Sequence, residues 1–101
     1  MTAGAERLAE LRDRIDAVDR RLMEALADRQ RLVEALARLK ADAAAVHDPG
    51  REREVMARVA AAAAEAGLSP AVARPLWRLL IARFTQHQLA LLDRDQPAPT
   101  A

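Results

Sequence analysis

Cationic, acidic and amide side chains that fall on apolar helical faces are the groups in this chain that could do chemistry. Arg29 is the one charge in a stripe of residues spaced three and four apart, a pattern typical of the buried face of a helix. Lys40 follows eleven positions later, about three turns on and at nearly the same azimuth. Gln88 is the one polar member of a second stripe. Such groups suit the binding of a small dianion and the stabilisation of charge separation without a covalent intermediate.

Arg29 and Gln88 each also have a structural interpretation. Burying an arginine is costly unless something pairs with it, so Arg29 meets a facing acid, sets the register of helix packing or binds an anionic ligand. A lone buried glutamine is more often a hydrogen-bonded structural residue than a catalytic one. Because both residues interrupt apolar stripes, a functional and a structural role both stay open for Gln88.

The chain has few residues that could support nucleophilic catalysis, metal binding or phosphate binding. Ser69 is the one serine and precedes a proline, as a helix cap does, and the chain has no cysteine or tyrosine. The two histidines, His47 and His87, lie forty positions apart and form no metal-binding pair along a helix. No glycine-rich loop is present to bind phosphate. We therefore expect no nucleophilic triad, no metal and no phosphate loop.

Length and composition predict one all-α domain. The chain has 101 residues, 31% of them charged, and a net charge of +1, without the basic, aromatic-rich stripe typical of nucleic-acid binding. No apolar run reaches the length of a membrane span, and the absence of cysteine fits a reducing, cytoplasmic setting. We predict a helical domain over residues 1–92 and a disordered tail over residues 93–101.

The longest predicted helix covers residues 5–40, and no glycine or proline interrupts it. Such a helix is about 50 Å long, whereas a compact monomer of this size is about 33 Å across. We therefore predict a symmetric dimer in which this helix packs against its copy; the alternative is a break near its middle. Arg12 and Arg29 are about 25 Å apart on the helix, too far for one subunit to bring both to one small ligand.

A second helix is predicted from residue 51 to residue 66, with Asp48 as its N-cap, Pro49 at its first position and Gly67 as a left-handed C-terminal cap. Asp48, Arg51 and Glu52 share the upstream end of its buried face. They form either an inward-facing charged cluster or a self-satisfied ion pair at the start of the helix. The residues predicted on that face are Glu52, Val55, Val59, Ala63 and Ala66.

A third helix is predicted to begin at Ser69-Pro70, and Pro75 either kinks it or marks its effective start. Its apolar stripe contains Gln88. His87, next in sequence, is interpreted as a partly exposed surface histidine. The members of the stripe are Trp77, Ile81, Phe84, Gln88 and Leu91.

Taken together, these residues resemble the all-helical chorismate mutase family. The resemblance covers about residues 8–92, and its specificity comes from the ordered set with matching spacing and not from any single motif. It is carried by LRDRIDAVD at residues 11–19, then Arg29, Lys40, Asp48, Arg51-Glu52 and Gln88. It implies an intertwined dimer of three-helix subunits that rearranges chorismate to prephenate without a cofactor.

The resemblance also implies roles for the polar residues. Arg12 of the partner subunit and Arg29 would bind the two carboxylates of the substrate, with Arg51 in support, since guanidinium groups bind carboxylates through two bonds. Lys40 and Gln88 would donate hydrogen bonds to the ether oxygen, which gains negative charge as its bond to carbon breaks.

Two acids and one departure from the family pattern bear on the substrate. Asp48 and Glu52 would hold the ring hydroxyl and select the reactive conformer. Phe84 stands where many members have a small hydroxyl residue, so one carboxylate contact is missing and the pocket is tighter. A mutase of 4-amino-4-deoxychorismate and an isochorismate pyruvate-lyase are the alternatives on this scaffold. A non-catalytic helical dimerisation module is the alternative from another class.

Overall fold

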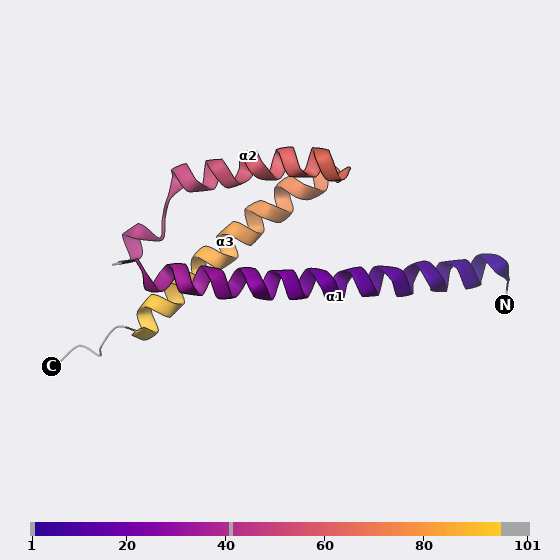
Figure 1. Cartoon of the computed structure of the whole chain (residues 1–101), viewed down its shortest axis with the longest axis horizontal. Coiled ribbons are helices and arrows are strands. Elements are labelled where there is room, and N and C mark those ends of the chain that lie inside the picture. Colours follow the sequence, from indigo (N-terminus) through magenta and orange to yellow (C-terminus); the bar gives the residue numbers. More distant parts are fainter. Residues whose placement is uncertain (1, 41, 96–101) are drawn as a thin grey trace. The chain divides into compact units, whose positions relative to one another are not determined.

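The protein is all-α, as the sequence predicts. The computed structural model describes residues 2–40 and 42–95, which form three α-helices and a short 3-10 helix and contain no strand (Figure 1). These residues divide into two units, one ending at residue 32 and the other beginning at residue 33. The elements are α1 (Ala3–Arg38), η1 (Ala43–Ala45), α2 (Pro49–Ala66) and α3 (Pro70–Asp95).

Helix α1 is continuous over 36 residues, so the alternative of a break near its middle is wrong. It ends at Arg38, two residues before the predicted boundary. Its last turn tightens, because the amides of Leu39 and Lys40 donate to the carbonyls three residues back at 3.1 Å. Lys40 therefore lies just beyond the helix and not within it.

The apolar stripe of α1 lies exposed on the single chain. The side chains of the stripe in the first unit are between 39% and 58% exposed, whereas side chains in the core of a domain are almost fully buried. Ala37, in the second unit, is the one buried residue of α1. The stripe in the first unit consists of Leu8, Leu11, Ile15, Val18 and Leu22.

Polar caps set the ends of the shorter elements. The Asp42 carboxylate accepts the amide of Ala45 at 3.1 Å and starts η1 in a stretch whose structure the sequence pattern leaves open. Asp48 caps α2, and Pro49 occupies its first turn, as predicted. Gly67 ends α2 with φ of 74°, a left-handed conformation in which glycine carries no steric penalty.

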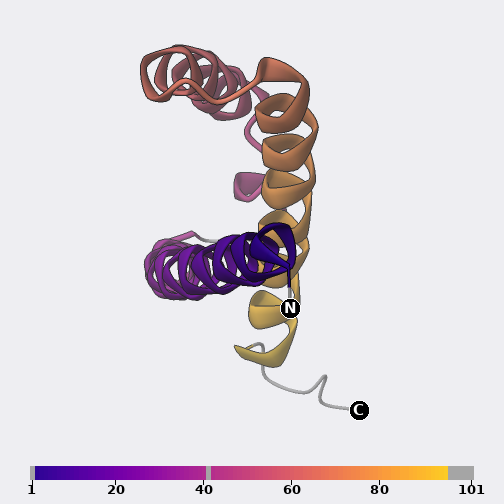
Figure 2. The same ribbon diagram turned by 90° about the vertical axis from the view of Figure 1, so that its right-hand side faces the viewer.

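Helices α2 and α3 form the core of the second unit. They lie side by side near the turn that joins them and diverge away from it (Figures 1 and 2). Small residues let the backbones approach closely there, and two larger side chains complete the cluster. The buried residues are Val59, Ala63 and Ala73, with Val55 and Trp77 packed against them. Ala66 and Glu52, also predicted on the buried face of α2, are exposed because they lie toward its two ends.

Helix α3 runs from Pro70 through Pro75, so the alternative that it effectively starts at Pro75 is wrong. The proline lies in the second turn, where its missing amide removes a single helical hydrogen bond. The predicted stripe from Trp77 to Leu91 is confirmed, since each member is buried or half-buried. The helix reaches Asp95, three residues into the predicted tail, and residues 96–101 lie outside the described part.

Candidate active site

Lys40 and Gln88, 48 positions apart in sequence, meet in the structure. The Lys40 Nζ atom donates to Oε1 of Gln88 at 2.8 Å. Gln88 is 7% exposed and is the one buried polar residue of the described chain, whereas Lys40 is half-buried. A short bond from a cation offsets much of the cost of burying the amide. The packing of α3 therefore brings together two hydrogen-bond donors that the sequence presents separately.

The chemistry of lysine determines which way the Gln88 amide points. An ammonium group has only donors, so the atom that faces it at hydrogen-bond distance must be the amide oxygen. The Nε2 group of Gln88 is thereby left to donate elsewhere. Lys40, with three N–H bonds, can also donate to a second acceptor while it holds Gln88.

A second polar contact lies beside this pair. His87 Nε2 lies 3.3 Å from Oε1 of Glu34, a residue of α1 in the second unit. Both side chains are partly buried, at 34% and 22% exposure. His87 is partly exposed as predicted, whereas its contact with Glu34 was not predicted. The available signal was the position of Glu34, one turn before Ala37 and two before Lys40 on the face that reaches α3.

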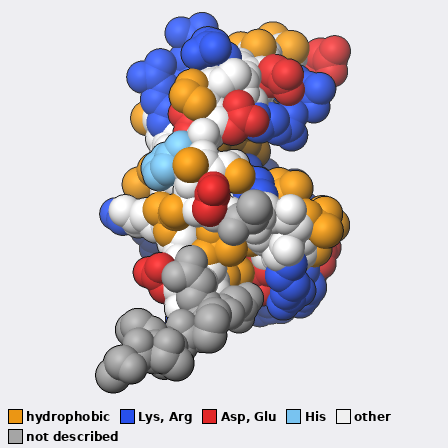
Figure 3. Space-filling model, turned by 90° about the vertical axis from the view of Figure 1, so that its left-hand side faces the viewer, with side chains coloured by type: hydrophobic (Ala, Val, Ile, Leu, Met, Phe, Trp, Pro, Cys, Tyr) orange, Lys and Arg blue, Asp and Glu red, His pale blue; other side chains and the backbone are white. Residues whose placement is uncertain are grey.

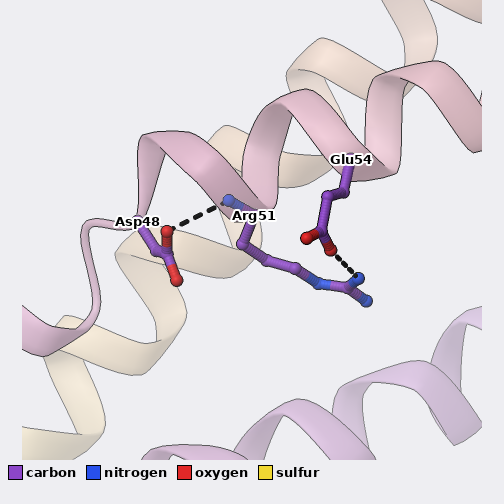
Figure 4. A network of polar contacts seen from close by, with 3 residues as sticks. All are labelled: Asp48, Arg51 and Glu54. Atoms are coloured by element: carbon purple, nitrogen blue, oxygen red, sulfur yellow. Dashed lines mark hydrogen bonds and ion pairs between the residues drawn. The ribbon is translucent and has the colours of Figure 1, made fainter.

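The start of α2 is charged and exposed. Asp48 Oδ1 accepts the amide of Arg51 at 3.0 Å, and the Arg51 guanidinium binds Glu54 at 3.1 Å (Figure 4). Figure 3 looks toward this end of α2 and shows side chains of both charges interspersed there. Of the two alternatives for Asp48, Arg51 and Glu52, the inward-facing cluster is wrong for the single chain, because all three residues are exposed. An exposed guanidinium binds the carboxylate one turn along its own helix, because nothing in the described unit covers it.

Glu52 borders an open groove between α2 and α3. The groove has a volume of about 560 Å³, within the range of small-ligand sites, and both charged and apolar residues line it. Its lining includes Glu52, Arg53 and Met56 from α2 and Arg78 and Ile81 from α3. Glu52 thus borders space that a small molecule can enter.

The other two arginines of the candidate site, Arg12 and Arg29, lie in the first unit, on α1. Arg12 is exposed and Arg29 is half-buried. Because α1 is continuous between them, their separation of seventeen positions keeps them about 25 Å apart on one chain. Phe84, on α3 in the second unit, lies one turn before Gln88 and is half-buried.

Chorismate mutase type II is the family whose sequence model matches the chain, over residues 11–89. The chain belongs to the type II chorismate mutase family. The match spans all three helices and every residue singled out above, from Arg12 to Gln88. The search of curated proteins finds no match.

Membership of this family makes the protein an isomerase of chorismate mutase type. Its activity is the rearrangement of chorismate to prephenate. In the described ranges 2–40 and 42–95, no three histidine, aspartate or glutamate side chains are grouped to hold a metal ion. No helix of the same ranges is long and apolar enough to cross a membrane.

Proposed function

We propose that Lys40 and Gln88 stabilise the transition state of the rearrangement by donating to the ether oxygen of the substrate. The observation that supports this role is the 2.8 Å contact in which Lys40 donates to Oε1 of Gln88, because it holds the ammonium group beside an amide whose Nε2 can still donate. Negative charge grows on that oxygen as its bond to carbon breaks. Donors already in place stabilise such charge without the cost of reorganising solvent. No covalent intermediate and no cofactor takes part.

The carboxylates of the substrate are bound in this proposal by Arg29 and by Arg12 of the partner subunit, with Arg51 in support. Positions 12 and 29 are equidistant from the boundary between Arg20 and Arg21. An antiparallel pair of α1 helices with its two-fold axis at that boundary places Arg12 of the partner subunit opposite Arg29. One dimer then holds two equivalent sites.

The exposed stripe of α1 supports this dimer. Fully burying a leucine, isoleucine or valine contributes about 1.5–3 kcal/mol, so covering five half-exposed side chains on each subunit is strongly favourable. A second copy of α1 offers the same stripe, which is what a two-fold interface requires. We place the enzyme in the cytoplasm, acting in aromatic amino acid biosynthesis.

Asp48 and Glu52 are proposed to hold the substituent at ring position 4 and select the reactive conformer. Both are exposed in the single chain, and Glu52 borders the groove described above. Carboxylates accept hydrogen bonds from a hydroxyl and bind an ammonium group at least as well. The 4-amino analogue of chorismate is therefore a second candidate substrate that these two acids favour.

Purified protein is expected to consume chorismate, with loss of its ultraviolet absorbance and appearance of prephenate. The measurement compares chorismate, 4-amino-4-deoxychorismate and isochorismate under the same conditions. A higher kcat/KM on the amino analogue assigns the protein to that substrate. Release of pyruvate from isochorismate identifies a lyase. No turnover of any of the three, by folded protein, contradicts the proposal and supports a dimerisation module.

Mixing two inactive variants tests the shared site. Each proposed site takes Arg29 from one subunit and Arg12 from the other. A heterodimer of Arg12→Ala and Arg29→Ala therefore retains one intact site, and its second site lacks both arginines. Random reassociation after co-refolding makes half of the dimers mixed, and activity should recover to about a quarter of the parent value. Arg14→Ala, also on α1, is the matched control and should mix without effect.

Sedimentation of the same samples establishes the oligomeric state. A folded monomer at micromolar concentration contradicts the dimer. Confirmed heterodimers that stay inactive indicate instead that each site is built from one chain.

A further inference from the structure

Two side-chain contacts tie the end of α1 to α3. One is the Lys40–Gln88 pair at 2.8 Å, and the other joins Glu34 to His87 at 3.3 Å. His87 and Gln88 are consecutive on α3, and Glu34 precedes Lys40 by six positions, about 9 Å along a helix. The two contacts therefore hold the same two segments, a short distance apart.

The position of Lys40 depends on these contacts between α1 and α3 more than that of a residue within a helix would. Lys40 lies two positions beyond the last residue of α1, where its backbone amide donates to the carbonyl of Ala37. Its ammonium group ends a flexible four-carbon stem with several rotamers. Where that group lies relative to Gln88 is set by how the end of α1 is held against α3.

The demands on the two contacts differ when substrate binds. In the proposed function, Lys40 and Gln88 each use a further N–H group to donate to the ether oxygen, so both members of this pair also contact the substrate. The Glu34–His87 contact involves no group that the proposed function assigns to the substrate. It is also partly shielded from water, at 34% and 22% exposure, so solvent weakens it less than a surface pair.

We propose that Glu34 and His87 are positioning residues that hold the end of α1 against α3, so that Lys40 and Gln88 donate to the same atom of the substrate. The proposal rests on the proposed function of Lys40 and Gln88. Neither positioning residue needs to touch the substrate. Their effect is expected on the chemical step, since a misplaced donor loses transition-state stabilisation more than substrate binding.

The test compares two replacements of His87. His87→Leu removes the ring nitrogen, and kcat should fall about threefold to tenfold while KM stays within about twofold. His87→Gln places an N–H donor the same number of bonds from Cβ and should restore most of kcat. Glu34→Leu should lower kcat by a similar factor, and the double variant with His87→Leu should fall no further. His47→Leu, at an exposed histidine, is the control and should leave kcat unchanged.

A second readout needs no substrate. The side-chain amide signals of Gln88 in an NMR spectrum report its bond to Lys40. They should shift in His87→Leu and return toward the parent position in His87→Gln. If the parent is inactive on every substrate tried, the proposed function fails, and these signals alone decide whether Glu34 and His87 position the pair.

Three results overturn the positioning role. One is an unchanged kcat in His87→Leu, and another is an equal loss of kcat in His87→Leu and His87→Gln. The third is an unshifted Gln88 amide in His87→Leu. If His87→Leu lowers the melting temperature but leaves kcat unchanged, the positioning role is also overturned. The contact then stabilises the fold without positioning the donors.

Discussion

Replacing Arg29 with alanine should lower kcat/KM for chorismate by about tenfold to a hundredfold. The side chain is half-buried on α1, in a stripe that is otherwise largely apolar, and is proposed to bind a substrate carboxylate. A hydrogen bond to a charged group contributes about 1.5–3 kcal/mol. Each ~1.4 kcal/mol corresponds to a tenfold change in rate. Steady-state kinetics on Arg29→Ala measure the loss, and Arg29→Lys should fall between variant and parent because it keeps charge without the planar two-point contact.

Arg31 provides the matched control for Arg29. It lies two positions along the same helix, its side chain is 70% exposed, and it binds Asp28 at 2.6 Å. Exposed pairs of this kind contribute little, so Arg31→Ala should stay within about twofold of the parent. If Arg29→Ala keeps its activity but loses the dimer in sedimentation, Arg29 sets the register of the helices and does not bind substrate.

Replacing Gln88 with glutamic acid should make the enzyme strongly pH-dependent. The amide donates at any ordinary pH, whereas a carboxyl group donates only while it is protonated. In the parent, Oε1 accepts from Lys40 and Nε2 is the donor proposed for the ether oxygen. In Gln88→Glu the second carboxyl oxygen must carry a proton to do the same work. Ionised, it repels the negative charge that grows on the substrate.

The direction of the pH effect follows from these protonation states. The free pKa of a glutamic acid is about 4.3; burial at this site raises the pKa of the introduced carboxyl, and the ammonium of Lys40 lowers it. Whatever the midpoint, kcat/KM of Gln88→Glu should fall as pH rises through that pKa, and the parent profile should stay comparatively flat. The measurement is the pH profile of kcat/KM for both proteins on the substrate that the parent turns over.

Gln86→Glu is the control, because Gln86 is exposed one position before His87 and accepts a bond from Arg83 at 3.0 Å. Its profile should match the parent. Equal profiles for the parent and a folded Gln88→Glu remove Gln88 from the transition state, and with it the proposed pairing of donors.

Much of the helical architecture could be predicted from local sequence. A run without glycine or proline predicts α1, and the residues at the ends of α2 predict its caps, down to the left-handed Gly67. These features depend on neighbours within one or two turns, so no tertiary information is needed. Pro75 was harder, because a proline early in a helix is tolerated when the rest of the helix is well packed.

The charged start of α2 shows where local reasoning fails. Spacing places Asp48, Arg51 and Glu52 on one helical face, but spacing alone does not say what covers that face. In the single chain nothing in the described unit does, and Arg51 binds Glu54 instead (Figure 4). The proposed dimer would supply the missing cover, and the complementation experiment tests its shared sites.

Sequence by itself determined the all-α class, the long α1 and the polar residues of the candidate site, since composition, periodicity and the family pattern are properties of the chain. Only the tertiary structure decided which of those residues meet. The contact of Lys40 with Gln88 and that of Glu34 with His87 each join segments about fifty positions apart. Their geometry depends on how α3 packs against the end of α1, and helical periodicity carries no information about the distance between two helices.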